Sequence, residues 1–199
     1  MTTAPLRKDA ARNWQRIVEV GRQLVDDGVP LQLNDVARLA GVGVATVYRH
    51  FPTPEALLET VATPGLEALA AHGERVLTDG DPWQALAGFL FAAIDAMLTD
   101  ASISSVTAVP HNALPRTMEL KARLQNLCGQ LLDRAHATGK VRRDVAQADL
   151  IPLMCGVVYA AKAHTSGHEP ARATGRRYLA VTLDGLRALP SRGVASPCH

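Results

Sequence analysis

The chain has 199 residues, of which 47% are hydrophobic, and its formal net charge at pH 7 is +2. This length allows one large domain or two small ones, and the apolar content is sufficient for a buried core, which excludes a disordered chain. The longest apolar run, residues 85–94, is well short of the roughly 20 residues that cross a bilayer, and residues 1–14 contain no apolar leader segment. We therefore expect a cytoplasmic protein with no membrane partner.

The cysteine and histidine residues predict neither a metal site nor a cofactor. Cys128, Cys155 and Cys198 are odd in number and lack the paired spacing of a disulfide framework or a zinc ribbon, so we expect buried or incidental thiols. His164 and His168 have the four-residue spacing that suits a metal on a helix, but a glycine and a proline close by indicate that this helix has already ended.

The first predicted element is a helix over about residues 7–27, because apolar residues recur at helical spacing up to a stop at Gly28. Basic residues are in excess near its start, and Arg7, Lys8 and Arg12 are candidates for contacts with DNA phosphates. A solvated helix face explains the same excess, and this segment alone does not separate the two explanations.

Residues 33–51, LNDVARLAGVGVATVYRHF, contain two very short helical patterns on either side of a glycine turn. Isolated helices shorter than about 12–15 residues are marginal in water, so both require packing on a third element. Ala37 lies where the two helices would cross, Gly41 supplies the left-handed turn between them, and Val47 packs back into the crossing. The pattern therefore predicts a helix-turn-helix, with an ordinary helical hairpin as the alternative.

The second short helix presents an outer face that a core does not need. Small residues at its start let the helix end approach base edges, and its polar side chains can reach phosphates or bases. In an ordinary helical hairpin these polar residues would be surface residues without a binding role. The expected DNA contacts are Gly43, Val44, Ala45, Thr46, Tyr48, Arg49 and His50.

The remaining sequence has almost no strand pattern, so the whole chain is predicted to be all-α. Thr53 can cap a helix that starts at Pro54, and the segment Thr63-Pro64-Gly65 is expected to break or kink that helix. Further helices are predicted over residues 66–77, 82–98, 116–139, 149–164 and 170–189, with a loop between the prolines at 110 and 115.

Residues 35–61, DVARLAGVGVATVYRHFPTPEALLETV, resemble the DNA-binding region of the TetR family of bacterial repressors, and the resemblance extends over about residues 12–61. It rests on the A-G-V turn, the T-V-Y-R-H-F helix and the E-A-L-L start of the next helix. The resemblance implies a homodimer that binds a palindromic operator and releases it when a small molecule enters the C-terminal domain. It also implies that Thr46, Tyr48 and His50 contact DNA, with Ala45 near base edges.

This resemblance, with the helix pattern, divides the chain into three parts. We expect a three-helix helix-turn-helix DNA-binding domain (1–53), a helical effector-binding and dimerisation domain (54–190) and a frayed tail (191–199).

Two positions depart from the family's pattern. The family commonly has a lysine at the start of the fourth helix that grips a phosphate, whereas this chain has Pro54, so the contact falls to Thr53 and nearby backbone N–H groups or is lost. Where the family often has Ser or Thr as the cap of the second helix, this chain offers Asn34 as a cap or phosphate contact. Pro64 is also unusual in a helix that normally links the two domains, and it marks either a hinge or a kink.

The predicted helix over residues 82–98 is apolar almost all round and belongs in the middle of a bundle. Together with the loop that follows and the helix carrying Met154, it offers apolar walls with few polar anchors, which favours a small, largely apolar or aromatic effector. Asp95 either marks a ligand or lies on an exposed or close-packed face, and its small neighbours favour the second explanation. The candidate ligand residues are Phe91, Asp95, His111, Met118, Met154 and Tyr159.

The last two predicted helices carry small and apolar residues that allow close packing across a two-fold axis. The expected dimerisation residues are Gly156, Ala160, Leu179, Leu183 and Leu186.

Three other functions are alternatives to a ligand-responsive repressor. An enzyme would require a catalytic constellation, and the sequence contains no phosphate-binding glycine loop, nucleophile elbow or paired His-carboxylate motif. A sequence-nonspecific architectural protein would normally carry far more positive charge than +2. A DNA-binding regulator without a small-molecule effector remains an alternative at this stage.

Overall fold

The computed structural model describes residues 4–78, 80–164 and 170–188, with side chains from Asp9 onward. This part of the chain is all-helical apart from one isolated β-bridge between Val141 and Arg187, which confirms the predicted fold class. The predicted tail, residues 191–199, lies outside the described residues. The helices are α1 (Ala4–Asp26), α2 (Leu33–Ala40), α3 (Val44–His50), α4 (Pro54–Val76), α5 (Pro82–Thr99), α6 (Ala101–Ala108), α7 (Pro115–Ala137), α8 (Gln147–Ala163) and α9 (Ala171–Leu186).

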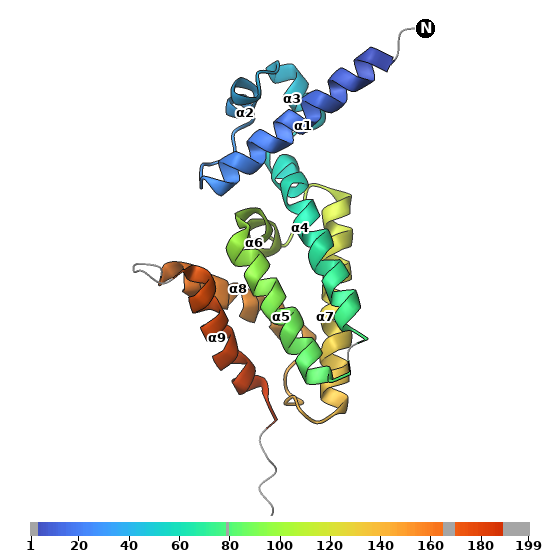
Figure 1. The fold of residues 1–199 in the computed structure, drawn as a ribbon, viewed down its shortest axis with the longest axis vertical. Coiled ribbons are helices and arrows are strands. Elements are labelled where there is room, and N and C mark those ends of the chain that lie inside the picture. The colour runs from blue at the N-terminus through green and yellow to red at the C-terminus, as the bar shows by residue number, and fades with distance from the viewer. Residues whose placement is uncertain (1–3, 79, 165–169, 189–199) are drawn as a thin grey trace, which may run out of the picture.

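Figure 1 shows an elongated molecule in which α1, α2 and α3 form one end, and α4 runs from them into the larger helical domain. The N-terminal core contains Ile17 of α1, Val36 of α2 and Val47 of α3, and Val61 of α4 belongs to it as well. Ala62, the next residue along α4, belongs to the larger core. The two cores therefore meet inside α4 and not at its start.

The Thr63-Pro64-Gly65 segment lies inside α4, which continues through it as one helix. Pro64 has no N–H to donate to the preceding turn, so one helical hydrogen bond is missing. Gly65 makes room for a neighbouring helix, because a Cβ at this position would lie 2.5 Å from the Cδ1 atom of Ile103 on α6. The segment expected to break the helix is therefore part of one continuous helix. It contains a proline, and it packs closely against α6.

Helix α6 was not predicted from the sequence. Its eight residues, ASISSVTA, include four serine and threonine residues, and these residue types compete with helix formation through side-chain hydrogen bonds. Asp100 caps the helix by accepting a hydrogen bond from the backbone N–H of Ser102 at 2.9 Å. Burial of Ile103 and Val106 in the larger core then holds this short helix in place.

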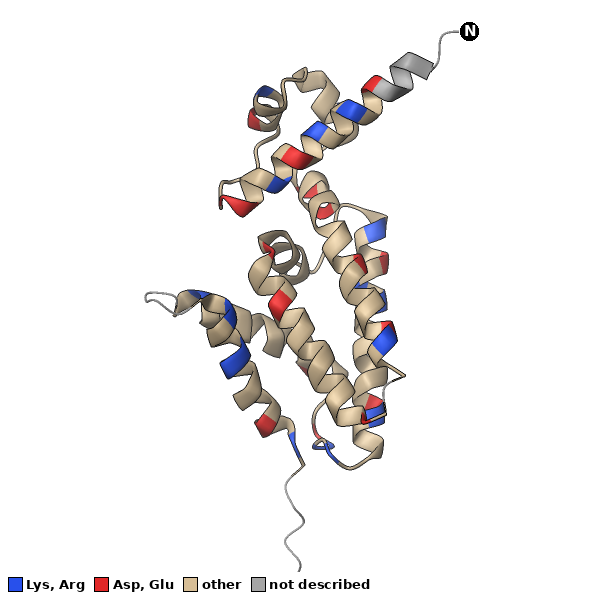
Figure 2. Cartoon of the chain, viewed as in Figure 1, with Lys and Arg blue, Asp and Glu red and all other residues tan. Residues whose placement is uncertain are grey.

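Helix α5 packs against α4, α6, α7, α8 and α9 and forms the centre of the larger domain. By length and composition it could cross a membrane, with a mean hydropathy of 1.2 over 18 residues, but 44% of it is buried within the domain. Asp95 is the one charged residue in the sequence of this helix, and α5 is otherwise tan in Figure 2. Helix α5 is a core helix, as its sequence predicts.

Candidate nucleic-acid interface and ligand cavity

The turn between α2 and α3 has the geometry that the sequence predicts. Gly41 adopts the left-handed conformation, with φ 63° and ψ 39°, and the N–H of Val42 donates to the carbonyl of Ala37 at 3.0 Å. Ala37 and Val47 are buried where the two helices cross. Because a side chain at position 41 would be strained in this conformation, the glycine fixes the angle at which α3 leaves α2.

The outward surface of α3 consists of small and polar residues, with one exposed valine and one exposed tyrosine. Gly43 stands at the N-cap position without a side chain, so the first backbone N–H groups of α3 have no side-chain cap. The helix contains no acidic residue, and two basic residues lie in its last turn. The predicted contact residues are all exposed or half-buried: Gly43, Val44, Ala45, Thr46, Tyr48, Arg49 and His50.

Three predicted phosphate contacts lie on the elements that flank α3. Thr53 is the N-cap of α4, and its hydroxyl oxygen accepts a hydrogen bond from the N–H of Ala56 at 3.2 Å. Asn34 is exposed, but the N-cap of α2 is Gln32, so the prediction that Asn34 caps this helix is wrong. Arg12 is exposed on α1 and lies 3.7 Å from Asp9.

The side chains of Arg7 and Lys8 lie outside the described residues. Their backbone belongs to α1, which the sequence placed there.

Sequence reasoning missed Arg16, which lies next to the glycine turn. Its Nη2 atom would be only 3.1 Å from a Cβ at Gly41, and its side chain is exposed. Two residues earlier on α1, Trp14 packs against Phe51 at the end of α3, with ring centroids 6.4 Å apart. Helical periodicity places Arg16 on α1, but its proximity to the turn depends on how α1 crosses α2 and α3.

Arg22 joins the N-terminal helices to the larger domain. Its guanidinium donates through Nη1 to Asp100 Oδ2 at 2.6 Å and through Nη2 to the carbonyl of Val61 on α4. Burial raises the pKa of the Asp100 carboxyl, but hydrogen bonds from Ser102 and Arg22 outweigh this effect and hold the pKa below its ordinary value. One arginine of α1 therefore contacts both α4 and the cap of α6.

Glu59 on α4 is a second connection, and it is only 3% exposed. Its carboxylate accepts hydrogen bonds from the backbone N–H groups of Ala113 and Leu114 at 2.6 and 2.8 Å, and from Asn112 Nδ2 at 3.3 Å.

Lys121 of α7 binds the same loop, donating to Asn112 Oδ1 at 2.9 Å and to the carbonyl of Val109 at 2.6 Å. Burial lowers the pKa of Lys121, and the charge of Glu59 opposes this shift. The loop after α6 is thus fixed to both α4 and α7.

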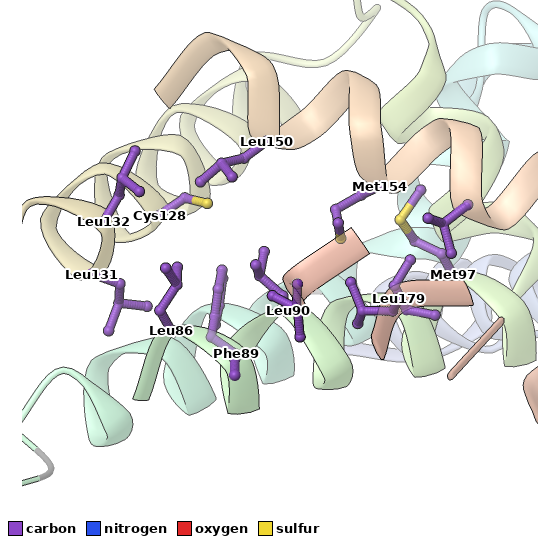
Figure 3. Packing of buried hydrophobic residues seen from close by; sticks show 14 of the residues in the cluster. Leu86, Phe89, Leu90, Met97, Cys128, Leu131, Leu132, Leu150, Met154 and Leu179 are labelled. Atoms are coloured by element: carbon purple, nitrogen blue, oxygen red, sulfur yellow. The ribbon is translucent and has the colours of Figure 1, made fainter. Parts of the chain in front are cut away.

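An apolar cavity of about 70 Å³ lies between helices α4 to α8. Phe89 and Leu90 of α5, Cys128 of α7 and Met154 of α8 are among its lining residues, and Ile103 of α6 lines it as well. Figure 3 shows the side chains of Cys128, Met154 and Met97 in the space between α5 and the helices above it. Thr107, near the end of α6, also lines the cavity. The loop that Glu59 binds follows directly after this helix.

Of the six predicted ligand residues, only Met154 lines this cavity. His111 and Met118 are exposed, and Tyr159 borders a shallow surface pocket that also contains Met97 and Cys155. The structure therefore places none of these three in the cavity wall, because His111 lies in the loop after α6, and Met118 of α7 and Tyr159 of α8 lie on exposed faces of their helices.

Phe91 and Asp95 face α9 instead of the cavity. The guanidinium of Arg176 lies 4.9 Å from the ring centroid of Phe91, and Asp95 accepts hydrogen bonds from Arg172 at 2.7 Å and Arg176 at 2.6 Å. The hydrogen bond from Arg172 outweighs burial and lowers the pKa of Asp95. This carboxylate joins α5 to α9, and Asp95 does not line the cavity.

The predicted dimerisation residues divide into two groups. Gly156 is exposed and Ala160 is half-buried on α8, whereas Leu179, Leu183 and Leu186 of α9 are buried in the core of this same chain. The three leucines are therefore unavailable to a second chain in this structure. The apolar stripe of an amphipathic helix normally packs on the core of its own domain, and the leucine stripe of α9 does so here.

The outward faces of α8 and α9 carry a different set of residues. Tyr159 is 77% exposed and Val181 is 70% exposed, which is unusual for large apolar side chains. Small residues surround them on both helices. The exposed set is Leu153, Gly156, Tyr159 and Ala163 on α8, and Ala173, Arg177, Ala180, Val181 and Asp184 on α9.

The described residues contain no group of three or more His, Cys, Asp or Glu side chains that could hold a metal ion. His164 packs edge-on against the ring of Tyr178, with centroids 6.3 Å apart. His168, the second half of the spacing considered above, lies outside the described residues.

Comparison with known proteins supports both the helix-turn-helix and the C-terminal helical domain. Residues 22–61 match the family of bacterial regulatory proteins of the tetR type, and residues 81–188 match the C-terminal domain of SbtR-like transcriptional regulators. An HTH-type transcriptional regulator of Staphylococcus aureus is 36% identical over 76 residues, which cover 37% of this chain and 41% of that protein. The chain thus matches less than half the length of its curated relatives.

Solved structures extend the similarity over nearly the whole chain. A TetR transcription regulatory protein from Mycobacterium vanbaalenii is 30% identical, covers 92% of this chain and 100% of its own, and superposes with a TM-score of 0.51. A TetR transcriptional regulator from Streptomyces coelicolor is 29% identical, covers 88% of this chain and 99% of its own, and has a TM-score of 0.54.

Two more distant structures share the fold alone and contain ligands. They are FadR from Bacillus subtilis with stearoyl-CoA, at 14% identity, and RolR with resorcinol, at 18% identity; the TM-scores are 0.65 and 0.61. FadR covers 87% of this chain and 99% of its own, and RolR covers 92% and 91%. With a helix-turn-helix at one end, an apolar cavity at the other and family matches over both, the chain belongs to the TetR family of bacterial transcriptional regulators.

Proposed function

We propose that this protein is a homodimeric repressor that binds a palindromic operator and releases it when a small, largely apolar ligand enters the cavity between α4 and α8. The chain is a helix-turn-helix transcriptional regulator and not an enzyme, as its family membership establishes. The observation that carries the proposal is the outward surface of α3, which is free of acidic side chains and held at a fixed angle by Gly41.

Helix α3 is short enough to enter the major groove with its N-terminal end first. Gly43 and Ala45 have no bulk that would keep the backbone from base edges, and Thr46 can contact a phosphate or a thymine methyl group. Tyr48 is exposed without contributing to the N-terminal core, which supports a role in contact with DNA. We infer that α3 is the recognition helix.

Phosphate contacts from the flanking elements would fix the orientation of α3. The Thr53 oxygen already accepts a hydrogen bond at the start of α4, so its hydroxyl hydrogen is available to a phosphate. Asn34 is exposed near the start of α2, where the helix dipole also favours an anion. Arg12 and Arg16 add positive charge along α1, and we include Arg7 and Lys8 on their sequence alone.

The outward face of α9 supports pairing with a second copy of this chain. Arg177 and Asp184 lie on that face at equal distances on either side of the Ala180–Val181 pair. If two copies of α9 cross antiparallel at this pair, each Arg177 faces the Asp184 of the partner subunit. In the single chain, Arg177 lies over the Tyr178 ring and Asp184 is 3.6 Å from Arg187. The charge pattern is therefore self-complementary in one register.

This register can be tested by sedimentation. Val181→Asp places a charge at the centre of the interface, and we expect a monomer at micromolar concentration. Arg177→Asp or Asp184→Arg alone should weaken the dimer by about 3- to 10-fold, because exposed ion pairs contribute little individually, and the double variant should regain most of the loss. Val109→Asp, at an exposed apolar position elsewhere, is the control. A monomeric unmodified protein would contradict the dimer.

Ligand binding would reach the DNA-binding end through α6 and α4. Ile103 lines the cavity and also packs against Gly65, so a side chain pushed outward by a ligand presses on α4. Arg22 contacts both the cap of α6 and the carbonyl of Val61, and thus links this movement to α1. A ligand can release the operator only if it binds the two states unequally. The ligand-bound structures of FadR and RolR support a ligand site in this fold.

Selection of DNA from a random duplex library tests the proposal as a whole. We expect the enriched sequences to contain an inverted repeat whose half-sites are separated by about one helical turn or a multiple of it. Enrichment without a common sequence would instead indicate an architectural DNA-binding protein and would overturn the proposed function.

A further inference from the structure

The sulfur-containing side chains of this protein are concentrated in its cavity. The chain has three cysteines and four methionines, and two of each line the space between α4 and α8. Met97 comes from α5, Cys128 from α7, and Cys155 and Met154 from α8, so the sulfur atoms approach the cavity from three helices. Figure 3 shows three of these four side chains around the same space.

The cavity wall offers almost nothing to a charged group. Thr107 already donates its hydroxyl hydrogen to the carbonyl of Ile103 at 2.6 Å. Burial raises the pKa of the Cys128 thiol to about 11 and also raises that of Cys155, so both thiols are neutral near pH 7. Lys121 lies at the adjoining surface pocket, but its ammonium group donates to Asn112 and to the carbonyls of Val106 and Val109. A ligand that enters this cavity must be uncharged.

Sulfur distinguishes this wall from a purely hydrocarbon one. Thioethers and thiols are polarisable and make favourable contacts with aromatic rings, with the sulfur about 5 Å from the ring. An aliphatic ligand gains only burial from the same surface. With sulfur on three of the surrounding helices and the ring of Phe89 beside them, the wall favours a ring with a π-system over a saturated ring of the same size.

The size of the cavity adds a second restriction. Its volume of about 70 Å³ is smaller than the roughly 150 Å³ of an engineered apolar cavity that binds benzene. Met97 and Met154 are unbranched and can change rotamer to admit one ring. A larger ring system would displace the α6 wall much further, beginning with Ile103 against Gly65.

We propose that the ligand is an uncharged molecule built on a single aromatic ring, recognised in the cavity by contacts with the sulfur atoms of Met97, Cys128, Met154 and Cys155. This inference rests on the proposed ligand-controlled function, but it concerns the binding step alone. It can therefore be tested separately from operator release.

Calorimetric titration with toluene and methylcyclohexane tests the inference, because the two probes share a carbon skeleton and differ in the π-system. We expect toluene to bind about 10-fold more tightly, which corresponds to two sulfur–ring contacts of ordinary strength. A hydrocarbon wall would prefer methylcyclohexane, which is the more hydrophobic of the two. Benzoate, which adds a charge to the ring, should not bind measurably.

The double variant Met97→Leu with Met154→Leu keeps the volume of the wall and removes two sulfur atoms. We expect the preference for toluene to fall to within about 2-fold, while Met118→Leu, at an exposed methionine outside the cavity, leaves it unchanged. Urea unfolding and operator binding verify that each variant is folded.

Equal binding of the two probes, or a preference that survives in the double variant, would overturn the inference. So would a protein that binds operator DNA but neither probe, and that result would leave DNA recognition intact. If toluene binds as expected without releasing the operator, the ligand class is supported and ligand-controlled release is the part of the proposed function that fails.

Discussion

The two ends of this molecule differ in how far apart in the sequence their contacting residues lie. At the DNA-binding end, the crossing of α2 and α3 depends on Ala37, Gly41 and Val47, which lie within one short stretch of sequence. At the other end, the cavity is lined by residues of five helices, α4 to α8. The first end tolerates little change at a few positions, whereas the second can change its wall residues while the helices keep their arrangement.

Removal of the Glu59 carboxylate should have the largest effect, because it breaks the long-range contact between α4 and the loop after α6. Glu59→Ala leaves the partly buried N–H groups of Ala113 and Leu114 without their acceptor. We expect the free energy of unfolding to fall by about 3–5 kcal/mol, because each of the two short hydrogen bonds to this charged group contributes about 1.5–3 kcal/mol. Urea denaturation monitored by circular dichroism measures this loss.

Glu67→Ala is the matched control for Glu59. Glu67 lies on the same helix and pairs with Arg116 at 2.6 Å, but both side chains are about half exposed. An exposed ion pair contributes about 0–1 kcal/mol, so the control should change stability little. Equal losses in the two variants would contradict the role assigned to the buried connection.

Replacement of Tyr48 tests the DNA-binding end by itself. Tyr48→Ala should weaken operator binding by about 1–3 kcal/mol, the scale of one good contact to DNA, and should leave the helical content unchanged because Tyr48 is not part of the N-terminal core. A fluorescence titration with labelled operator measures the change, and Val109→Ala serves as the control. Full affinity in a folded Tyr48→Ala protein would remove the main support for α3 as the recognition helix.

Asp100 lies where the two ends meet, and its contribution should depend on pH. The pKa of Asp100 is lower in the folded chain than its ordinary value, so the Arg22 contact stabilises the fold above about pH 4 and is lost as pH falls through the folded pKa. Asp100→Asn should therefore cost about 1–2 kcal/mol at pH 7. The difference from the unmodified protein should shrink at acid pH in urea titrations, and a constant difference would argue against the ion pair.

Arg12 should have the smallest effect, and one of a different kind. If it contacts a phosphate, Arg12→Ala weakens binding to all DNA sequences alike and lowers the slope of log affinity against log salt by about 1.8, which is about 0.9 for each subunit of the proposed dimer. Titrations of operator and scrambled DNA at several salt concentrations measure both quantities. A loss confined to the operator would assign Arg12 to base recognition.

The sequence predicts the DNA-binding end well because its pattern is local. The turn at Gly41 and the buried positions on either side follow from residue types only a few positions apart, and the structure places them as predicted. The contacts of Arg16 and Arg22 could not be read in the same way, because they depend on the angle at which α1 crosses its neighbours.

The cavity wall was poorly predicted because α5 is apolar on nearly every side. Such a helix has no clear polar face, so its sequence does not show whether Phe89 or Phe91 turns inward; the structure turns Phe89 to the cavity and Phe91 to Arg176. In α9 the leucine stripe predicted as a dimer interface covers the chain's own core. The outward surface is marked instead by small residues and by the exposed Val181.

The central claim, that α3 reads a specific DNA sequence, is tested most directly by comparing the selected operator with a scrambled duplex of the same composition. Fluorescence anisotropy at one fixed salt concentration gives both affinities. Specific recognition predicts that the operator binds at least about 10³-fold more tightly, and that Tyr48→Ala lowers operator affinity more than it lowers affinity for the scrambled duplex. Equal affinities for the two duplexes would contradict the account.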